Sequence, residues 1–275
     1  MTLITADGVA IEAACEPREA AAGGPSGDVP AIVVAHGFTG SLDRPAVRRV
    51  ARTLTRHAAV VTFSFRGHGR SGGRSTVGDR EVLDLAAVVR WARSLGHRTV
   101  ATVGFSMGGS VVLRHAALYR PQVDVPGLAP SAGAPDGAEG TAAGGTSGAH
   151  TDAVVAVSAP ARWYYRGTPA MRRVHWAITR PVGRLVSRYG LRTRIHDRDW
   201  DPVPMPPVEA VRLIAPTPLL IVHGDRDPYF PLDHPRSLAT AAGGTARLWI
   251  EPGLGHAENA VDDALLHRIG AWITG

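Results

Sequence analysis

One serine in this 275-residue chain lies in a pattern that is typical of a nucleophile. Ser106 is the centre of Gly104-Phe-Ser-Met-Gly108, between a short apolar run and a helix-compatible segment over 110–119. A G-x-S-x-G turn between a strand and a helix exposes the serine oxygen at the end of the strand. It also places the N–H of Met107 at the start of the helix, where the helix dipole favours an oxyanion. Taken alone, the pattern also fits a glycine-rich turn without a catalytic role.

A serine nucleophile requires a base, and the base requires an acid that orients it. His256 follows an apolar segment over 246–250, and Asp227 follows another over 219–223, so each comes after a predicted strand. Asp225 is nearer to its strand and is the alternative acid, although a hydrogen bond within the turn also explains it. We expect the base and the acid to meet the serine, because the ends of parallel strands share one edge of a sheet.

The elements that must position these side chains alternate along the chain. Apolar runs typical of buried strands are separated by segments whose apolar residues recur at helical spacing. Residues 2–14 predict a hairpin of two edge strands. Further strands are predicted over 31–35, 60–65, 99–104, 152–157, 218–223 and 246–250, and helices over 44–57, 79–95, 110–119, 233–242 and 258–273. This order predicts an α/β fold with a mostly parallel, doubly wound sheet flanked by helices.

Two stretches depart from this alternation. Residues 121–151 have few large apolar side chains and predict a flexible, low-complexity loop. Residues 161–214 predict a helical cap, or lid, that is inserted into the main domain. The core would then consist of residues 1–160 and 215–275.

The predicted cap is strongly basic. It contains eleven arginines and four acidic residues, whereas the whole chain has a formal charge of +6. Arg180, Arg184, Arg188 and Arg192 recur every four residues with apolar side chains between them, which predicts an amphipathic basic helix. Such a face is either solvated or attracts an anionic substrate or membrane surface. The arginine-rich cap therefore suggests that the protein makes weak peripheral contact with an anionic surface.

The composition argues against several kinds of site. All 30 basic residues are arginine, which excludes a lysine Schiff base, and the single Cys15 cannot form an intramolecular disulfide. The chain has no H-E-x-x-H motif, no cysteine–histidine cluster and no dinucleotide-binding G-x-G-x-x-G after a strand. We therefore expect no cofactor, no metal and no nucleic-acid partner. With no signal-peptide pattern and no apolar run of about 18 residues, a cytoplasmic location is predicted.

Five motifs resemble, in order, those of the α/β-hydrolase superfamily. They are His36-Gly-Phe38, Arg66-Gly-His-Gly-Arg-Ser71, Gly104-Phe-Ser-Met-Gly108, His223-Gly-Asp-Arg-Asp-Pro228 and Gly253-Leu-Gly-His256. The resemblance extends over residues 31–275, except for the loop over 121–151 and the interior of the cap. The resemblance implies that Ser106 is the nucleophile, His256 the general base and Asp227 the orienting acid. It also implies that the N–H groups of Phe38 and Met107 form the oxyanion hole.

The same resemblance implies hydrolysis of a small-molecule carboxylic ester, or a thioester, through an acyl-enzyme on Ser106. The alternatives are acyl transfer and a non-catalytic ligand-binding or sensor role on the same fold. Candidate pocket residues are His36, Trp163, Tyr164 and Tyr165, although bracing of a loop also explains the histidine and core packing the aromatic residues. The sequence indicates neither the acyl group nor the oligomeric state.

Overall fold

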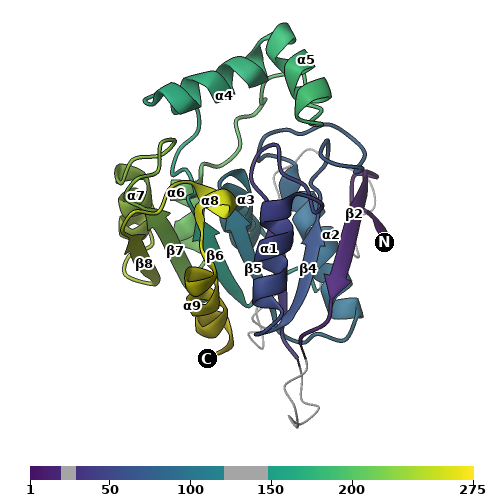
Figure 1. Cartoon of the computed structure of the whole chain (residues 1–275), viewed down its shortest axis with the longest axis vertical. Coiled ribbons are helices and arrows are strands. Elements are labelled where there is room, and N and C mark those ends of the chain that lie inside the picture. The colour runs from purple at the N-terminus through teal and green to yellow at the C-terminus, as the bar shows by residue number, and fades with distance from the viewer. Residues whose placement is uncertain (20–28, 121–147) are drawn as a thin grey trace, which may run out of the picture.

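The computed structural model describes residues 1–19, 29–120 and 148–275, and their strands form one eight-stranded sheet (Figure 1). The strands are β1 (Thr2–Ile4), β2 (Ala10–Glu16), β3 (Ala31–Ala35), β4 (Ala59–Phe63), β5 (Val100–Phe105), β6 (Ala153–Val157), β7 (Leu219–Gly224) and β8 (Ala246–Glu251). Their order is β1-β2-β4-β3-β5-β6-β7-β8, and β2 runs antiparallel to both of its neighbours while all other pairs are parallel. Most of the predicted low-complexity loop over 121–151 lies outside the described residues.

The central strands are buried because both of their faces are covered. β3, β4, β5, β6 and β7 are buried at every position, which is why their sequences are almost continuously apolar. Helices α1 (Pro45–Leu54), α8 (Ala257–Ala260) and α9 (Asp263–Thr274) lie on one side of the sheet (Figure 1). Helices α2 (Glu81–Ser94), α3 (Met107–Leu118) and α7 (Asp233–Ala241) cover the other side. The predicted doubly wound α/β architecture is confirmed.

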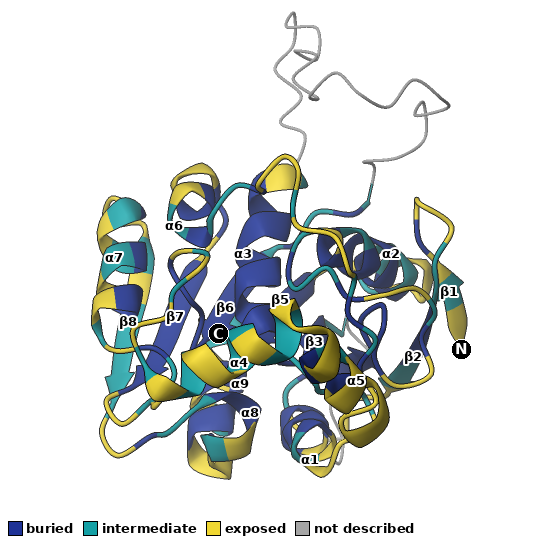
Figure 2. Cartoon of the chain, turned by 90° about the horizontal axis from the view of Figure 1, so that it is seen from above, coloured by how far each residue is buried: buried dark blue, intermediate teal, exposed yellow. Residues whose placement is uncertain are grey.

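The insertion after β6 forms a helical cap over the carboxyl ends of the strands. Its helices α4 (Pro169–Thr179) and α5 (Pro181–Gly190) lie above the sheet, away from the helices that cover its faces (Figures 1 and 2). Arg180 caps the end of α4 and the start of α5, so a single residue separates the two helices. Among the described residues, no helix is both long and apolar enough to span a bilayer.

The insertion is shorter than the sequence predicted. Helix α6 (Pro207–Ala210) and the following 3-10 turn η1 (Val211–Leu213) lie against α3 and bury Val211 in the core of the main domain. The Val208 N–H donates to the Ala161 carbonyl at 2.9 Å, so the two ends of the insertion are neighbours. Residues 207–214 therefore belong to the core, because Ala210, Val211 and Ile214 are buried in it.

The return segment of the cap is hydrogen-bonded to the loop that follows β4. The Arg194 N–H donates to the Gly67 carbonyl at 2.8 Å, and the Ser75 N–H donates to the Arg194 carbonyl at 2.7 Å. The His196 N–H donates to the Ser75 carbonyl at 2.8 Å. This short ladder fixes one end of the cap to the edge of the sheet that carries Ser106.

Candidate active site

Ser106 lies between β5 and α3 in a conformation that is unusual for a residue with a side chain. Its φ is 52° and its ψ is −112°, and its N–H donates to the Val157 carbonyl at 2.9 Å. The turn requires two glycines, since a Cβ on Gly104 would overlap the Gly108 carbonyl and a Cβ on Gly108 would overlap the Ala35 carbonyl. The close approach of these backbones holds the serine in its strained conformation at the start of α3.

The Ser106 hydroxyl begins a chain of hydrogen bonds that ends at a buried carboxylate. Its Oγ lies 2.9 Å from His256 Nε2, and His256 Nδ1 lies 2.7 Å from Asp227 Oδ2. Because an ionised carboxylate can only accept, Nδ1 carries the proton and Nε2 is free to accept the serine proton. The three predicted residues, which follow β5, β7 and β8, are thus brought into contact.

The side chain of Asp227 is fully buried and is nevertheless held as a carboxylate. Burial by itself raises its pKa, but the hydrogen bond and charge of His256 and two backbone N–H groups outweigh that effect, so the pKa is lowered. The N–H groups of Tyr229 and Phe230 donate to Oδ1 at 2.8 Å and 3.1 Å. The acid therefore presents its other oxygen to the base in a fixed orientation.

Two neighbours of Asp227 stabilise its loop. Asp225, the alternative acid, is exposed and accepts the Gly253 N–H at 2.7 Å, as expected for a residue that braces a turn. His223 is buried, and its Nε2–H donates to the Phe230 carbonyl at 2.8 Å. Burial lowers the pKa of His223, so a neutral ring lies 3.7 Å from the Asp227 carboxylate. The geometry thus pairs Asp227, and not Asp225, with the base.

Two backbone N–H groups next to the serine have no partner in the described chain. Phe38 follows β3, Met107 begins α3, and both residues line the same cavity as Ser106 and His256. Neither N–H donates to another described residue. Free N–H groups beside a serine are available to an oxyanion, and these two belong to the residues that the resemblance indicated.

Glu258 belongs to the site although no sequence motif indicated it. It lies on α8, is 6% exposed, and accepts the Gly37 N–H with its Oε1 at 2.9 Å. Burial raises the pKa of this carboxyl group. Because Gly37 precedes Phe38, Glu258 joins the segment that carries one oxyanion donor to the loop that carries His256. The signal in the sequence is one acidic residue, two positions after the histidine.

His36 does not line the cavity, which corrects its prediction as a pocket residue. The ring is completely buried, its Nδ1–H donates to the Gly37 carbonyl at 2.7 Å, and its Nε2 accepts the Phe65 N–H at 3.0 Å. Burial lowers its pKa to about 3, so the ring is neutral. His36 braces the loop after β3 from the side of the core.

A cavity of about 1010 Å³ lies between Ser106 and the cap. The three predicted aromatic residues, Trp163, Tyr164 and Tyr165, line it. Sequence reasoning did not identify its other walls, which include Met171, Val174 and Ile178 of α4, Tyr229 and Phe230 beside the acid, and Arg166, Arg173 and Arg198 of the cap. The described residues contain no group of three or more histidine, cysteine or acidic side chains arranged to hold a metal.

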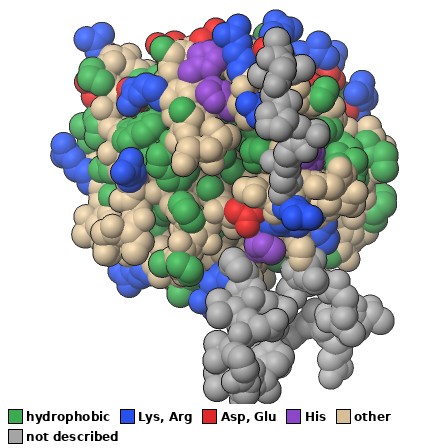
Figure 3. All heavy atoms as spheres, turned by 90° about the horizontal axis from the view of Figure 1, so that it is seen from below, with side chains coloured by type: hydrophobic (Ala, Val, Ile, Leu, Met, Phe, Trp, Pro, Cys, Tyr) green, Lys and Arg blue, Asp and Glu red, His purple; other side chains and the backbone are tan. Residues whose placement is uncertain are grey.

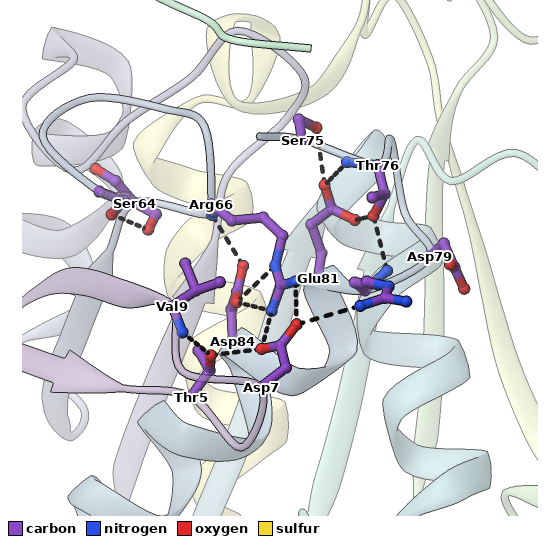
Figure 4. A network of polar contacts seen from close by, with 12 residues as sticks. Thr5, Asp7, Val9, Ser64, Arg66, Ser75, Thr76, Asp79, Glu81 and Asp84 are labelled. Carbon is purple, nitrogen blue, oxygen red and sulfur yellow. Dashed lines mark hydrogen bonds and ion pairs between the residues drawn. The ribbon is translucent and has the colours of Figure 1, made fainter. Parts of the chain in front are cut away.

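One wall of the cavity is the loop after β4, which a buried carboxylate organises (Figure 4). Glu81, the first residue of α2, accepts the N–H groups of Thr76 and Gly78 at 2.8 Å and 2.9 Å and the Thr76 hydroxyl at 2.6 Å. Trp200, at the end of the cap, donates its Nε1–H to the Thr76 carbonyl at 2.7 Å. The cap therefore rests on a loop that is itself tied to the core.

Comparison with known proteins agrees with this arrangement. A protein-family model described as "alpha/beta hydrolase fold" matches residues 30–129, which include Phe38 and Ser106. The esterase Pf2001 of Pyrococcus furiosus is similar in structure, with a TM-score of 0.68 and 20% identity over 100% of this chain and 92% of that one. This chain has the α/β-hydrolase fold. The predicted resemblance is thereby confirmed at the level of the fold.

Two further solved structures are similar to this chain. Est1E from Butyrivibrio proteoclasticus, in a structure with bound ferulic acid, has a TM-score of 0.61 and 19% identity, covering 100% of this chain and 96% of that one. XC6422 from Xanthomonas campestris, described as a serine hydrolase without a lid, has a TM-score of 0.57 and 19% identity, covering 99% and 90%. A search of curated proteins found no match.

Proposed function

We propose that this protein is a serine hydrolase that cleaves a carboxylic ester, or a thioester, through an acyl-enzyme on Ser106. The observation that carries the proposal is the hydrogen-bonded chain from Ser106 through His256 to Asp227. It lies at a cavity whose lining includes the two residues with unpaired N–H groups, Phe38 and Met107. Esterases among the structures of the same fold support the proposal.

In the proposed acylation step, Ser106 Oγ attacks the acyl carbon while His256 Nε2 takes its proton. The Asp227 carboxylate, which its lowered pKa keeps ionised, stabilises the imidazolium. The oxyanion accepts hydrogen bonds from the N–H groups of Phe38 and Met107. Each such donor stabilises the transition state by about 3–4 kcal/mol. His256 then returns the proton to the leaving alcohol or thiol as the bond to the acyl carbon breaks.

In the proposed deacylation step, water takes the place of the leaving group. His256 Nε2 accepts a proton from the water as its oxygen attacks the acyl carbon of the ester on Ser106. Collapse of the second tetrahedral intermediate releases the carboxylic acid and returns the proton to Ser106 Oγ. An alcohol that enters instead of water would give acyl transfer, so the product formed with and without an added alcohol distinguishes these reactions.

The first test is the Ser106→Ala variant on short p-nitrophenyl esters. We expect hydrolysis to fall to background while the melting temperature stays close to that of the wild type. A fluorophosphonate probe should label the wild type at Ser106 and leave the variant unlabelled. Full activity in the variant would refute the proposal, and folded wild-type protein that does not react with the probe would favour a non-catalytic binding role.

A further inference from the structure

The outer side of α5 carries large apolar side chains that nothing in the described chain covers. Val182, Leu185, Val186 and Tyr189, which we name the α5 face, are 62%, 57%, 52% and 72% exposed. They recur at positions i, i+3, i+4 and i+7, the spacing of one stripe along a helix. In Figure 2, α5 lies on the outside of the molecule and is mostly exposed. A stripe of this kind normally packs against a core, so its exposure indicates an interaction surface.

The exposure of this face follows from how α5 packs against the rest of the cap. Its buried residues are the small ones, Gly183 and Ser187, four positions apart. A Cβ on Gly183 would overlap the backbone of Ala177, and the Ser187 carbonyl accepts the Thr193 N–H at 2.9 Å. The helix thus approaches its neighbours through its small residues and turns its large ones outward.

Unpaired arginines border the α5 face. Arg180, Arg188 and Arg192 are exposed, and none of the three forms an ion pair with a described carboxylate. The Arg188 guanidinium lies over the Tyr189 ring, 5.5 Å from its centroid. The face therefore combines aliphatic and aromatic side chains with a basic border, which is the composition of a helix that lies in a membrane interface.

We propose that the α5 face docks the protein on a bilayer surface that contains anionic lipid. The charges favour this occupant over a second copy of the chain, because a symmetric contact would bring the arginines of one copy against those of the other. Basic side chains also occur on the face opposite the cap, where they are dispersed around the surface (Figure 3). What distinguishes the α5 face is that its arginines border a continuous apolar stripe.

The test is sedimentation with phosphatidylcholine vesicles that contain or lack phosphatidylglycerol. It uses the Ser106→Ala protein, so the result does not depend on the proposed catalytic function. We expect binding to the anionic vesicles that is strongly reduced in about 0.5 M NaCl, where the screening length is about 4 Å. Arg180→Gln combined with Arg188→Gln should lower the partition coefficient about twenty-five-fold, since each basic residue near such a surface contributes about fivefold.

Matched variants show whether a loss of vesicle binding comes from the lost charge, from the lost apolar contact or from unfolding of the protein. Arg180→Lys with Arg188→Lys should keep the binding because the charge is kept. Leu185→Ser with Tyr189→Ser should weaken it about tenfold or more, because two exposed apolar side chains no longer enter the interface. All these positions are exposed, so the melting temperature should stay unchanged.

Control substitutions elsewhere should leave vesicle binding unchanged. Arg212→Gln with Arg236→Gln removes two exposed arginines outside the cap, and Ile4→Ser with Leu95→Ser removes two apolar residues that are 63% and 46% exposed. Equal binding to both kinds of vesicle, or no binding, would overturn the proposal. So would a dimer in solution that Leu185→Ser with Tyr189→Ser converts to a monomer, since the face would then be an interface between copies.

Discussion

Substitution of Glu258 tests how the proposed oxyanion hole is held in place. Its carboxyl group is the acceptor for the buried Gly37 N–H, and Gly37 precedes the proposed donor Phe38. Glu258→Ala removes the acceptor and leaves the N–H unpaired, whereas Glu258→Gln keeps an acceptor oxygen in the same place. Comparison of the two variants therefore isolates the hydrogen bond from the charge.

The expected fall in kcat follows from the free-energy cost of leaving a buried polar group unpaired. Leaving a buried donor without a partner costs about 1–3 kcal/mol, and complete loss of an oxyanion donor costs about 3–4 kcal/mol. If the segment around Phe38 relaxes so that the Gly37 N–H finds another acceptor, the Phe38 N–H moves from its place. The transition state then loses part of the stabilisation that this oxyanion donor provides. We therefore expect Glu258→Ala to lower kcat by about tenfold to a few hundredfold, with KM nearly unchanged, because the oxyanion forms only after binding.

Stability should respond to pH in a defined direction. Glu258 ionises near its ordinary pKa of 4.5 in the unfolded chain, and burial raises that pKa in the folded protein. The stability contributed by the protonated group is thus fully present below about pH 4.5 and is lost as the pH rises through the folded pKa. Because Glu258→Gln has no proton to lose, its melting temperature should rise relative to the wild type over this range.

Steady-state kinetics on a short p-nitrophenyl ester and melting curves across the pH range test both points. Glu251→Ala is the control, because this carboxylate pairs with Arg268 at 2.9 Å and does not line the cavity. Unchanged kcat in Glu258→Ala would refute the positioning role. A kcat in Glu258→Gln as low as in Glu258→Ala would show that the charge, rather than the hydrogen bond, is what matters.

Further expectations concern the proposed acid, the turn that carries Ser106, and the cap. Asp227→Asn should lower kcat by about 10⁴-fold while Asp225→Asn changes it little, and equal losses in the kinetics would contradict the assigned pairing. Gly108→Ala should abolish the folded state in circular dichroism because its Cβ overlaps two backbone carbonyls, whereas Gly190→Ala, where nothing lies within 4 Å, should melt like the wild type. Trp200→Phe removes the indole hydrogen bond to the loop after β4. We expect this change to raise KM several-fold while kcat is retained. An unchanged KM would show that this anchor of the cap does not affect substrate binding.

The sequence predicts the core of this molecule well because buried parallel strands are continuous apolar runs. The strand predicted over 31–35 is β3 to the residue, and the helix predicted over 44–57 contains α1. The approximate place of the candidate site follows from the same regularity, since His256 comes just after a strand. Continuous apolar runs carry this information because both faces of the sheet are covered by helices of the same chain.

The sequence does not predict which way a side chain in a loop turns. Asp225 and Asp227 are both acidic and two residues apart, and only the fold of the loop directs Asp227 inward. The same limit explains the wrong prediction for His36, whose ring turns to the core side of its loop. The sequence does not indicate the role of Glu258, because this role depends on a contact with Gly37, which is 221 positions away.

Helical spacing also does not reveal what covers an apolar stripe. The residues of α5 predict an amphipathic helix, and the structure contains one. The pattern is the same whether the stripe meets a core or solvent, so its outward orientation becomes visible only when Gly183 and Ser187 are seen to form the contact.

The hydrogen bond between Val208 and Ala161 makes the cap an exchangeable module. Forty-six residues separate Ala161 from Val208 in the sequence, yet the two are hydrogen-bonded neighbours, so a turn of a few residues would close the same gap. Closing the longer loop costs only about 2 kcal/mol more than closing a turn of about five residues. Recombination or design can therefore replace the cap, and with it much of the lining of the cavity, while the strands that precede Ser106, Asp227 and His256 keep their register.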